Sequence, residues 1–165
     1  MKEQNEFTMK RLATLSIGTL MIAAAGMAQA EGLERINPPT IVDTSPWGFS
    51  QVVVAPSSAK TVYISGQFSG DKEGNVLGKT VGKQAELAFD NLRKAIEASG
   101  GQPEHVVKIQ VLVAGHGEDK LHAIGEQISK LFGEHLPAST LIPVDRLALD
   151  GMLFEIDATL AIPQS

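Results

Sequence analysis

The stretch TVGKQAELAFDNLRKAIEASGGQPEHVVKIQVLVA, residues 80–114, decides the fold class because its hydrophobic period changes once along its length. In the first half, apolar residues recur three and four positions apart, which predicts an amphipathic helix that Thr80 caps. Gly100 and Gly101 are placed to end that helix. The alternation of Val107, Ile109, Val111 and Val113 with other residues then predicts a strand with one buried face.

Elements on both sides of this stretch extend the pattern. Two β-branched runs precede it, SQVVVA and KTVYISG, and the short PSSA connection favours a neighbouring antiparallel pair. A second amphipathic helix follows it and should end at Gly133. Its predicted apolar stripe consists of Leu121, Ile124, Ile128, Leu131 and Phe132.

The closing segment contains two further strand-like runs. Asp150 and Gly151 lie between them as a two-residue turn, which predicts a β-hairpin. The resulting register places Arg146 opposite Glu155. In the structural interpretation, Glu155 forms a cross-strand ion pair with Arg146. In the functional interpretation, Glu155 is a general acid or base that positions a water.

The predicted order of elements is strand, strand, helix, strand, helix, strand, strand. A sheet with both helices on one face satisfies this order, so we expect an α+β fold. Alternation along the last strand turns Phe154 towards the helices and Glu155 away from them. Ile142 and Val144 should share the face of Glu155, and this half-apolar face predicts partial burial against other subunits.

Composition excludes several classes of site. The chain has 165 residues, of which 43% are hydrophobic, and this suits one compact domain. It has no cysteine, which excludes disulfides, thiolate metal ligands and cysteine nucleophiles. The formal net charge is −5, and an acidic surface disfavours nucleic-acid binding.

The beginning of the chain has the layout of a signal peptide. A basic pair precedes an apolar run that ends in AQA at residues 28–30. We expect residues 1–30 to be a cleaved leader, with Met1 or Met9 as the start, and residues 31–165 to form an exported domain, most simply in the periplasm. Nothing downstream has transmembrane length, so no membrane association is expected after cleavage.

Three motifs do not justify a site. GNVLGKT would need a glycine where Glu73 stands to be a phosphate-binding loop, so we interpret it as a loop with a helix cap. His116, Asp119 and His122 lie close in sequence but lack a further convincing ligand, so no metal site is expected. No Ser-His-Asp arrangement is identifiable around Ser65.

Six segments resemble the RidA/YjgF family, also called the endoribonuclease L-PSP family, in order and spacing. They are GFSQVVV, VYISGQ, NLRKAIEASGG, VVKIQVLVA, LFGEHLPAS and FEIDATLAI, within residues 37–162. The resemblance implies a chorismate-mutase-like fold and a homotrimer whose sheets face inward, with ligand clefts between subunits. It also implies hydrolysis of enamines and imines, such as 2-aminoacrylate and 2-iminobutanoate, to 2-keto acids and ammonia without a cofactor.

Some positions of the family site are retained. The family's glutamate, which positions the attacking water, matches Glu155. Its SGQ turn matches Ser65, Gly66 and Gln67, and the glycine allows a ligand to approach the backbone closely. From the residues alone, an ordinary strand end is the alternative interpretation of this turn.

Other positions of the family site differ. The arginine that clamps the substrate carboxylate falls at Ser139 in LPAS. The family's tyrosine, asparagine and cysteine fall at Phe49, Gly125 and Leu141. A neutral serine cannot replace a charge-assisted fork, so efficient 2-imino acid deamination is not expected.

The sequence therefore predicts an exported, trimeric RidA-like protein that binds a small metabolite between subunits. It leaves open whether Glu155 hydrolyses imines or enamines there, or whether the trimer binds its ligand without turnover. Endoribonuclease activity is a weaker third alternative, because the acidic chain lacks a basic, aromatic-bearing patch.

Overall fold

The structure, a computed structural model, describes residues 32–164, so the predicted leader lies outside the described residues. Short 3₁₀ helices, η1 to η3, accompany the main elements. The main elements in chain order are β1 (Glu34–Ile36), β2 (Val52–Val54), β3 (Lys60–Phe68), α1 (Val81–Ala98), β4 (Val106–Ala114), α2 (Leu121–Phe132), β5 (Ala138–Val144) and β6 (Phe154–Ile162). Within residues 32–164, no helix has the length and apolar character needed to cross a membrane.

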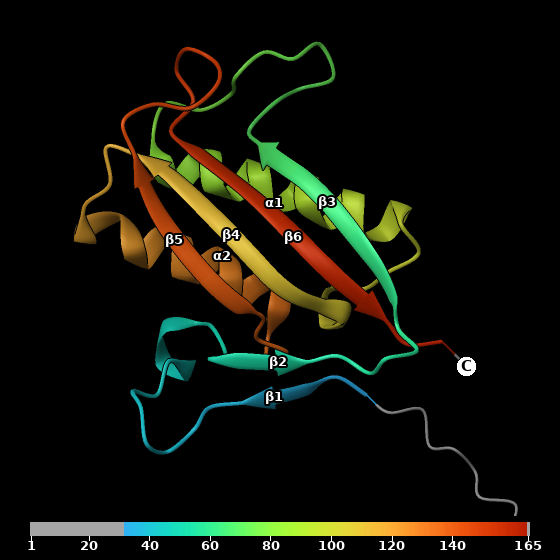
Figure 1. Cartoon of the computed structure of the whole chain (residues 1–165). Coiled ribbons are helices and arrows are strands. Elements are labelled where there is room, and N and C mark those ends of the chain that lie inside the picture. The colour runs from blue at the N-terminus through green and yellow to red at the C-terminus, as the bar shows by residue number, and fades with distance from the viewer. Residues whose placement is uncertain (1–31, 165) are drawn as a thin grey trace, which may run out of the picture.

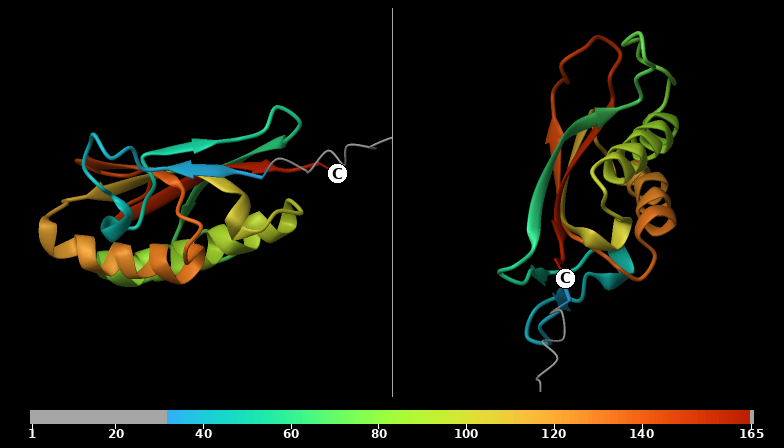
Figure 2. Two further views of the ribbon diagram at one scale, coloured as in Figure 1. Left: turned by 90° about the horizontal axis from the view of Figure 1, so that it is seen from below. Right: turned by 90° about the vertical axis from the view of Figure 1, so that its right-hand side faces the viewer.

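The domain has two layers and a small appendage. A mixed four-stranded sheet in the order β3-β6-β4-β5 forms one layer, and α1 and α2 lie side by side on one of its faces (Figures 1 and 2). β1 and β2 form a separate two-stranded sheet at one end (Figure 1). The α+β prediction with a sheet and two helices is therefore confirmed.

Helix α1 begins and ends where its sequence predicts. The Thr80 side chain accepts a hydrogen bond from the Lys83 backbone amide at 3.2 Å, which confirms the predicted N-cap. The buried stripe includes Ala85, Ala88, Leu92 and Ile96, all fully inaccessible to solvent. This stripe packs α1 on the sheet.

Helix α2 follows its prediction except at its first residue. Ile124, Ile128 and Phe132 are buried, and the backbone amide of Gly133 donates to the Ser129 carbonyl at 3.1 Å, which confirms the predicted end. Leu121 is 48% exposed, so its place in the buried stripe was predicted wrongly. As the first residue of the helix it lies at the edge of a pocket rather than over the sheet.

The strands bury the expected faces with one shift. In β6, Phe154, Ile156 and Leu160 are fully buried, as their alternation predicts. In β4 the register with β6 shifts between Val106 and Lys108, and the buried residue is Val106 rather than the predicted Val107. A bulge adds one residue and therefore reverses the alternation at that point.

The predicted strand neighbours were wrong at both ends of the chain. β2 pairs with β1, and β3 pairs with β6, so the two β-branched runs are not partners. β5 pairs with β4 in parallel, and β6 lies between β3 and β4 instead of beside β5. β4, α2 and β5 form a strand-helix-strand crossover, whose helix allows the two strands to run parallel.

The connection between β5 and β6 is a wide loop instead of a two-residue hairpin. Gly151 has the positive φ expected there, 83°, but Arg146 lies 3.5 Å from Asp150 rather than opposite Glu155. The buried Gln84 side chain holds the far end of the loop. Its amide donates to the Gly151 carbonyl at 2.7 Å and accepts from the Leu153 backbone amide at 2.7 Å.

The predicted division of the two sheet faces holds despite the wrong pairing. Glu155 of β6 and Ile142 of β5 both pair with Leu112 of β4, so these three residues point to the same side. Phe154 of β6 is fully buried in the core beneath the helices. The side away from the helices therefore combines acidic and apolar residues.

Candidate functional site

A pocket of about 990 Å³ opens on the helix side of the sheet. Residues on either side of the end of η1 (Ser45–Trp47) form one wall, a face of α2 forms the second, and β5 with the buried Val111 forms the third. The pocket brings together four of the eight candidate residues, which come from three distant segments of the chain. These four are Phe49, Gly125, Ser139 and Leu141.

The first wall is fixed to the start of β5 by hydrogen bonds. The backbone amide of Ser50 donates to the Pro137 carbonyl at 2.9 Å, and the Ser50 hydroxyl donates to the Leu136 carbonyl at 2.8 Å. The hydroxyl of the buried Thr44 donates to the Phe49 carbonyl at 2.9 Å. These bonds hold Phe49 in place beside β5.

Gly48 brings the same wall against α2. Its φ is +83°, and a Cβ there would lie 3.1 Å from Ile128 Cγ2, so both conformation and space favour glycine. Trp47 and Phe49 flank it, with ring centroids 6.4 Å apart and planes at 36°. Trp47 is 60% exposed, so the pocket has an aromatic wall whose surface is accessible.

The pocket has few polar groups in its interior, and its charged side chains are exposed to solvent. Ser139 pairs in register with the buried Ile109, which places its hydroxyl on the helix side of the sheet. On α2, His122 Nε2 lies 3.6 Å from Glu126 Oε1, and these side chains are 87% and 54% exposed. Lys130 is also exposed. Charges at the mouth are screened by solvent and do not make the interior polar.

Glu155 belongs to a second group of candidate residues on the other face of the sheet. β3 is irregular between Ile64 and Gln67, opposite β6. A Cβ on Gly66 would overlap the Glu155 carboxylate, so the carboxylate lies directly over this glycine. Ser65, Gly66 and Gln67 lie inside β3, so the predicted turn at a strand end is wrong, and these residues form an irregularity within the strand instead. The Gln67 side-chain amide donates to the Ser65 carbonyl at 3.1 Å there.

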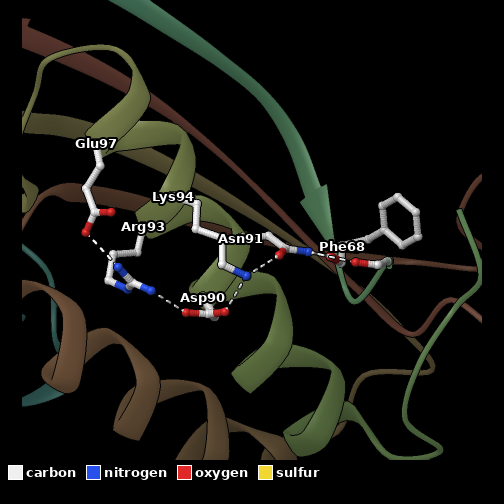
Figure 3. Close-up of polar contacts among 7 residues, drawn as sticks. Phe68, Asp90, Asn91, Arg93, Lys94 and Glu97 are labelled. Carbon is white, nitrogen blue, oxygen red and sulfur yellow. Dashed lines mark hydrogen bonds and ion pairs between the residues drawn. The ribbon is translucent and has the colours of Figure 1, made fainter. Parts of the chain in front are cut away.

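Asn91 of α1 contacts the end of β3 from the helix side, and it was not predicted as a site residue. Its side-chain amide donates to the carbonyls of Phe68 and Gly70, both at 3.0 Å (Figure 3). Arg93 and Lys94 contact Asp90 beside it at 2.7 and 2.6 Å (Figure 3). The available signal in the sequence was a polar residue next to the apolar stripe that contains Ala88 and Leu92.

A row of half-buried polar residues crosses the same open face of the sheet. Lys108 donates to the Thr140 hydroxyl at 2.6 Å, and the Gln110 amide donates to the Asp157 carboxylate at 3.4 Å. Burial lowers the pKa of Lys108 and raises the pKa of Asp157. These residues were not singled out from the sequence, because their half-burial depends on strands that are distant in the chain.

Within one subunit, the two groups of candidate residues lie on opposite faces of the sheet. Ser139 and Leu141 pair with Ile109 and Val111 on the helix side, whereas Glu155 pairs with Leu112 on the open side. The pocket lining does not include Glu155 or residues 65–67 of β3. Glu155 can therefore act at a pocket of this kind only if another subunit supplies one of the two groups.

The loop before α2 and the first turn of that helix contain His116, Asp119 and His122, for which the sequence predicts no metal site. The part of the chain that the structure describes has no group of three or more metal-type side chains close enough to hold an ion. His116 Nδ1 is buried without a hydrogen-bond partner among these residues, but Asp119 and His122 are solvent-exposed. The glycine-rich GNVLGKT loop ends in the helix cap at Thr80, as expected.

Known proteins similar to this chain agree on one family. The family described as Endoribonuclease L-PSP matches residues 44–162. The human 2-iminobutanoate/2-iminopropanoate deaminase is 30% identical over 111 residues, which cover 67% of this chain and 77% of that protein. A protein of the same name from Dermatophagoides farinae is 25% identical over 130 residues, covering 77% of this chain and 99% of that protein.

Solved structures give the same assignment. YyfB of Yersinia pestis, from the conserved Rid protein family, is 31% identical with a TM-score of 0.76, and the match covers 80% of this chain and 100% of that one. RidA from an Antarctic Psychrobacter species is 29% identical with a TM-score of 0.56, over 78% of this chain and 99% of that one. The chain therefore belongs to the endoribonuclease L-PSP family, which is the RidA/YjgF family that its sequence resembles.

Proposed function

We propose that the protein binds a small metabolite in the pocket beside Trp47 and Phe49, and hydrolyses reactive imines or enamines there. The observation that carries this proposal is the meeting of Phe49, Gly125, Ser139 and Leu141 in one accessible, mainly apolar pocket. Two relatives named as 2-iminobutanoate/2-iminopropanoate deaminases support the reaction class.

The proposed reaction needs one water and one proton-transfer group. Water adds to the carbon of the C=N bond, and the resulting carbinolamine loses ammonia to leave a carbonyl compound. The sum is R₂C=NH + H₂O → R₂C=O + NH₃. Glu155 accepts the proton of the attacking water and returns a proton to the leaving nitrogen, as a general base and acid.

In this proposal the active unit is a homotrimer, because Glu155 must come from a neighbouring subunit. The open sheet face offers the contact surface, since Tyr63 is 81% exposed there and Ile142 is 36% exposed. Half-buried Lys108 and Asp157 lie on the same face. Light scattering of the purified protein should give the mass of three chains, and a monomer mass would contradict the proposal.

Ser139 distinguishes the proposed activity from 2-imino acid deamination. A hydroxyl cannot form the paired, charge-assisted contacts by which a guanidinium binds a carboxylate. Ser139→Arg is therefore expected to increase kcat/KM for 2-aminoacrylate, generated in situ by a dehydratase. Ser139→Gln, a longer side chain without a charge, is the matched control and should not give this increase.

The protein is also proposed to act after export. The basic pair, apolar run and AQA sequence of residues 1–30 support a leader that is removed after Ala30. Residues 31–165 would then be the working domain in the periplasm. N-terminal sequencing of the protein from a periplasmic extract should begin at Glu31, and an intact leader on protein in the cytoplasmic fraction would overturn this step.

A non-catalytic binding trimer is the second candidate function. It is favoured by the position of Glu155, which lies on the opposite sheet face from the pocket of its own subunit. Imine hydrolysis monitored as ammonia release separates the two functions. Turnover that Glu155→Gln abolishes supports the enzyme, whereas saturable binding with ammonia release equal to the protein-free control supports the binding trimer.

A further inference from the structure

Gly125 occupies a position in α2 where the fold itself gives no reason for glycine. It lies in the fifth position of a twelve-residue helix, and a Cβ there would have nothing within 4 Å. Glycine inside a helix costs about 1 kcal/mol relative to alanine. By contrast, Gly82 of α1 is needed for packing, because a Cβ there would lie 3.2 Å from Ala123 Cβ.

The space left by Gly125 belongs to the pocket. Gly125 lines the pocket on α2, between the turns that carry Leu121 and Ser129. The Trp47 and Phe49 rings form another part of the same lining. A helix surface without a side chain and an accessible aromatic wall together fit a flat ring better than a branched aliphatic group.

The polar groups of the pocket suit a neutral reacting group. Among the described residues that line it, the cationic or ionisable basic side chains are His122 and Lys130, and both are exposed at the mouth. The interior offers Ser139, a hydroxyl that can donate one hydrogen bond to a nitrogen or oxygen. Within the lining that one subunit provides, an anionic carboxylate would lose its hydration without a buried cation to replace it.

We infer that the pocket takes a ring-bearing imine or enamine that carries no carboxylate at its reacting carbon. This inference rests on the proposed function and defines its substrate class. For an aryl methyl imine, the products are the aryl methyl ketone and ammonia, with one water consumed. A reaction that oxidises primary amines would supply such a substrate.

Four stable carbonyl compounds test the inference by binding to the purified protein. Acetophenone carries a methyl group where phenylglyoxylate carries a carboxylate, and both contain a ring. Butanone and 2-oxobutanoate differ in the same way but contain no ring. Calorimetry or ligand-observed NMR should rank acetophenone first, at least about tenfold above phenylglyoxylate and above butanone, a ratio that corresponds to about 1.4 kcal/mol.

The outcomes separate this inference from the proposed function. If phenylglyoxylate or 2-oxobutanoate binds as tightly as acetophenone, the substrate class is wrong although the pocket still binds carbonyl compounds. If none of the four binds and ammonia is released from neither acetophenone imine nor 2-aminoacrylate, the proposed function itself fails.

A variant pair tests whether binding uses the space at Gly125. Gly125→Leu places a side chain in the pocket at a position where helix propensity favours it, so the protein should fold and lose acetophenone binding at least tenfold. Gln127→Leu, on the same helix but outside the pocket lining, is the matched control and should keep the affinity. Unchanged affinity in folded Gly125→Leu would overturn the inference.

Discussion

Gly66→Ala tests how Glu155 is held, because the added methyl group would overlap its carboxylate. Besides that overlap, the new Cβ would lie 2.7 Å from Glu155 Cδ and 3.1 Å from Cγ, so rotating the carboxylate alone does not remove the conflict. Overpacking of this kind costs about 1–3 kcal/mol. Replacing glycine also lowers the conformational entropy of the unfolded chain. This stabilises the folded protein by about 0.4–1 kcal/mol where the backbone conformation allows the new residue.

The net expectation is a loss of roughly 1–2 kcal/mol in the free energy of unfolding, measured by urea denaturation. In a Glu155→Ala background the conflict disappears, so Gly66→Ala should be neutral or stabilising there. The coupling in this double-mutant cycle should therefore be at least about 1 kcal/mol. Ser65→Ala, at an exposed neighbouring position, is the control. Equal costs of Gly66→Ala in both backgrounds would refute the placement of Glu155 over Gly66.

Four further predictions concern stability. Gly125→Ala should raise the free energy of unfolding by about 0.5–1 kcal/mol. Gly133→Ala, equally free of neighbours but at φ +54°, should lower it by about 1–2 kcal/mol. Gln84→Leu should cost about 2–4 kcal/mol, because it leaves the Gly151 carbonyl and Leu153 amide without their partner. The raised pKa of Asp157 means that stability is lost as pH rises above 3.8, and Asp157→Asn should remove that slope in thermal denaturation.

The periodic parts of the fold could be predicted because local residue patterns determine them. Thr80 and Gly133 mark helix ends through short-range hydrogen bonds, and the alternation of Phe154 with Glu155 assigns the sheet faces. Strand neighbours could not be obtained in the same way. Periodicity tells which side of a strand is buried, but not which strand lies beside it.

The hairpin error shows this limit most clearly. Asp150 and Gly151 do form a turn with positive φ, yet the turn lies inside a longer loop that Leu147 and Met152 anchor as buried residues. The crossover through α2 places β5 beside β4 instead. The predicted pairing of Arg146 with Glu155 failed for this reason.

Half of the candidate positions lie together in one pocket, but their arrangement could not be predicted. The resemblance identified Phe49, Gly125, Ser139 and Leu141, and these positions meet in the pocket. The alternation of residues assigns Glu155 to the other sheet face, but the neighbours of each strand have no local signal. Asn91 also had only a weak signal, because its two backbone acceptors lie at and just after the end of β3, more than twenty residues away in the sequence.

Subunit complementation tests the central claim most directly, namely that one subunit provides the pocket and another provides Glu155. Gly125→Leu blocks the pocket and Glu155→Gln removes the acid, so each homo-oligomer should be inactive in ammonia release from acetophenone imine. Co-expressed and purified as mixed trimers, the two variants should recover a substantial fraction of wild-type activity. Mixed trimers that form but remain as inactive as the parents, while the wild type turns over, would contradict the claim.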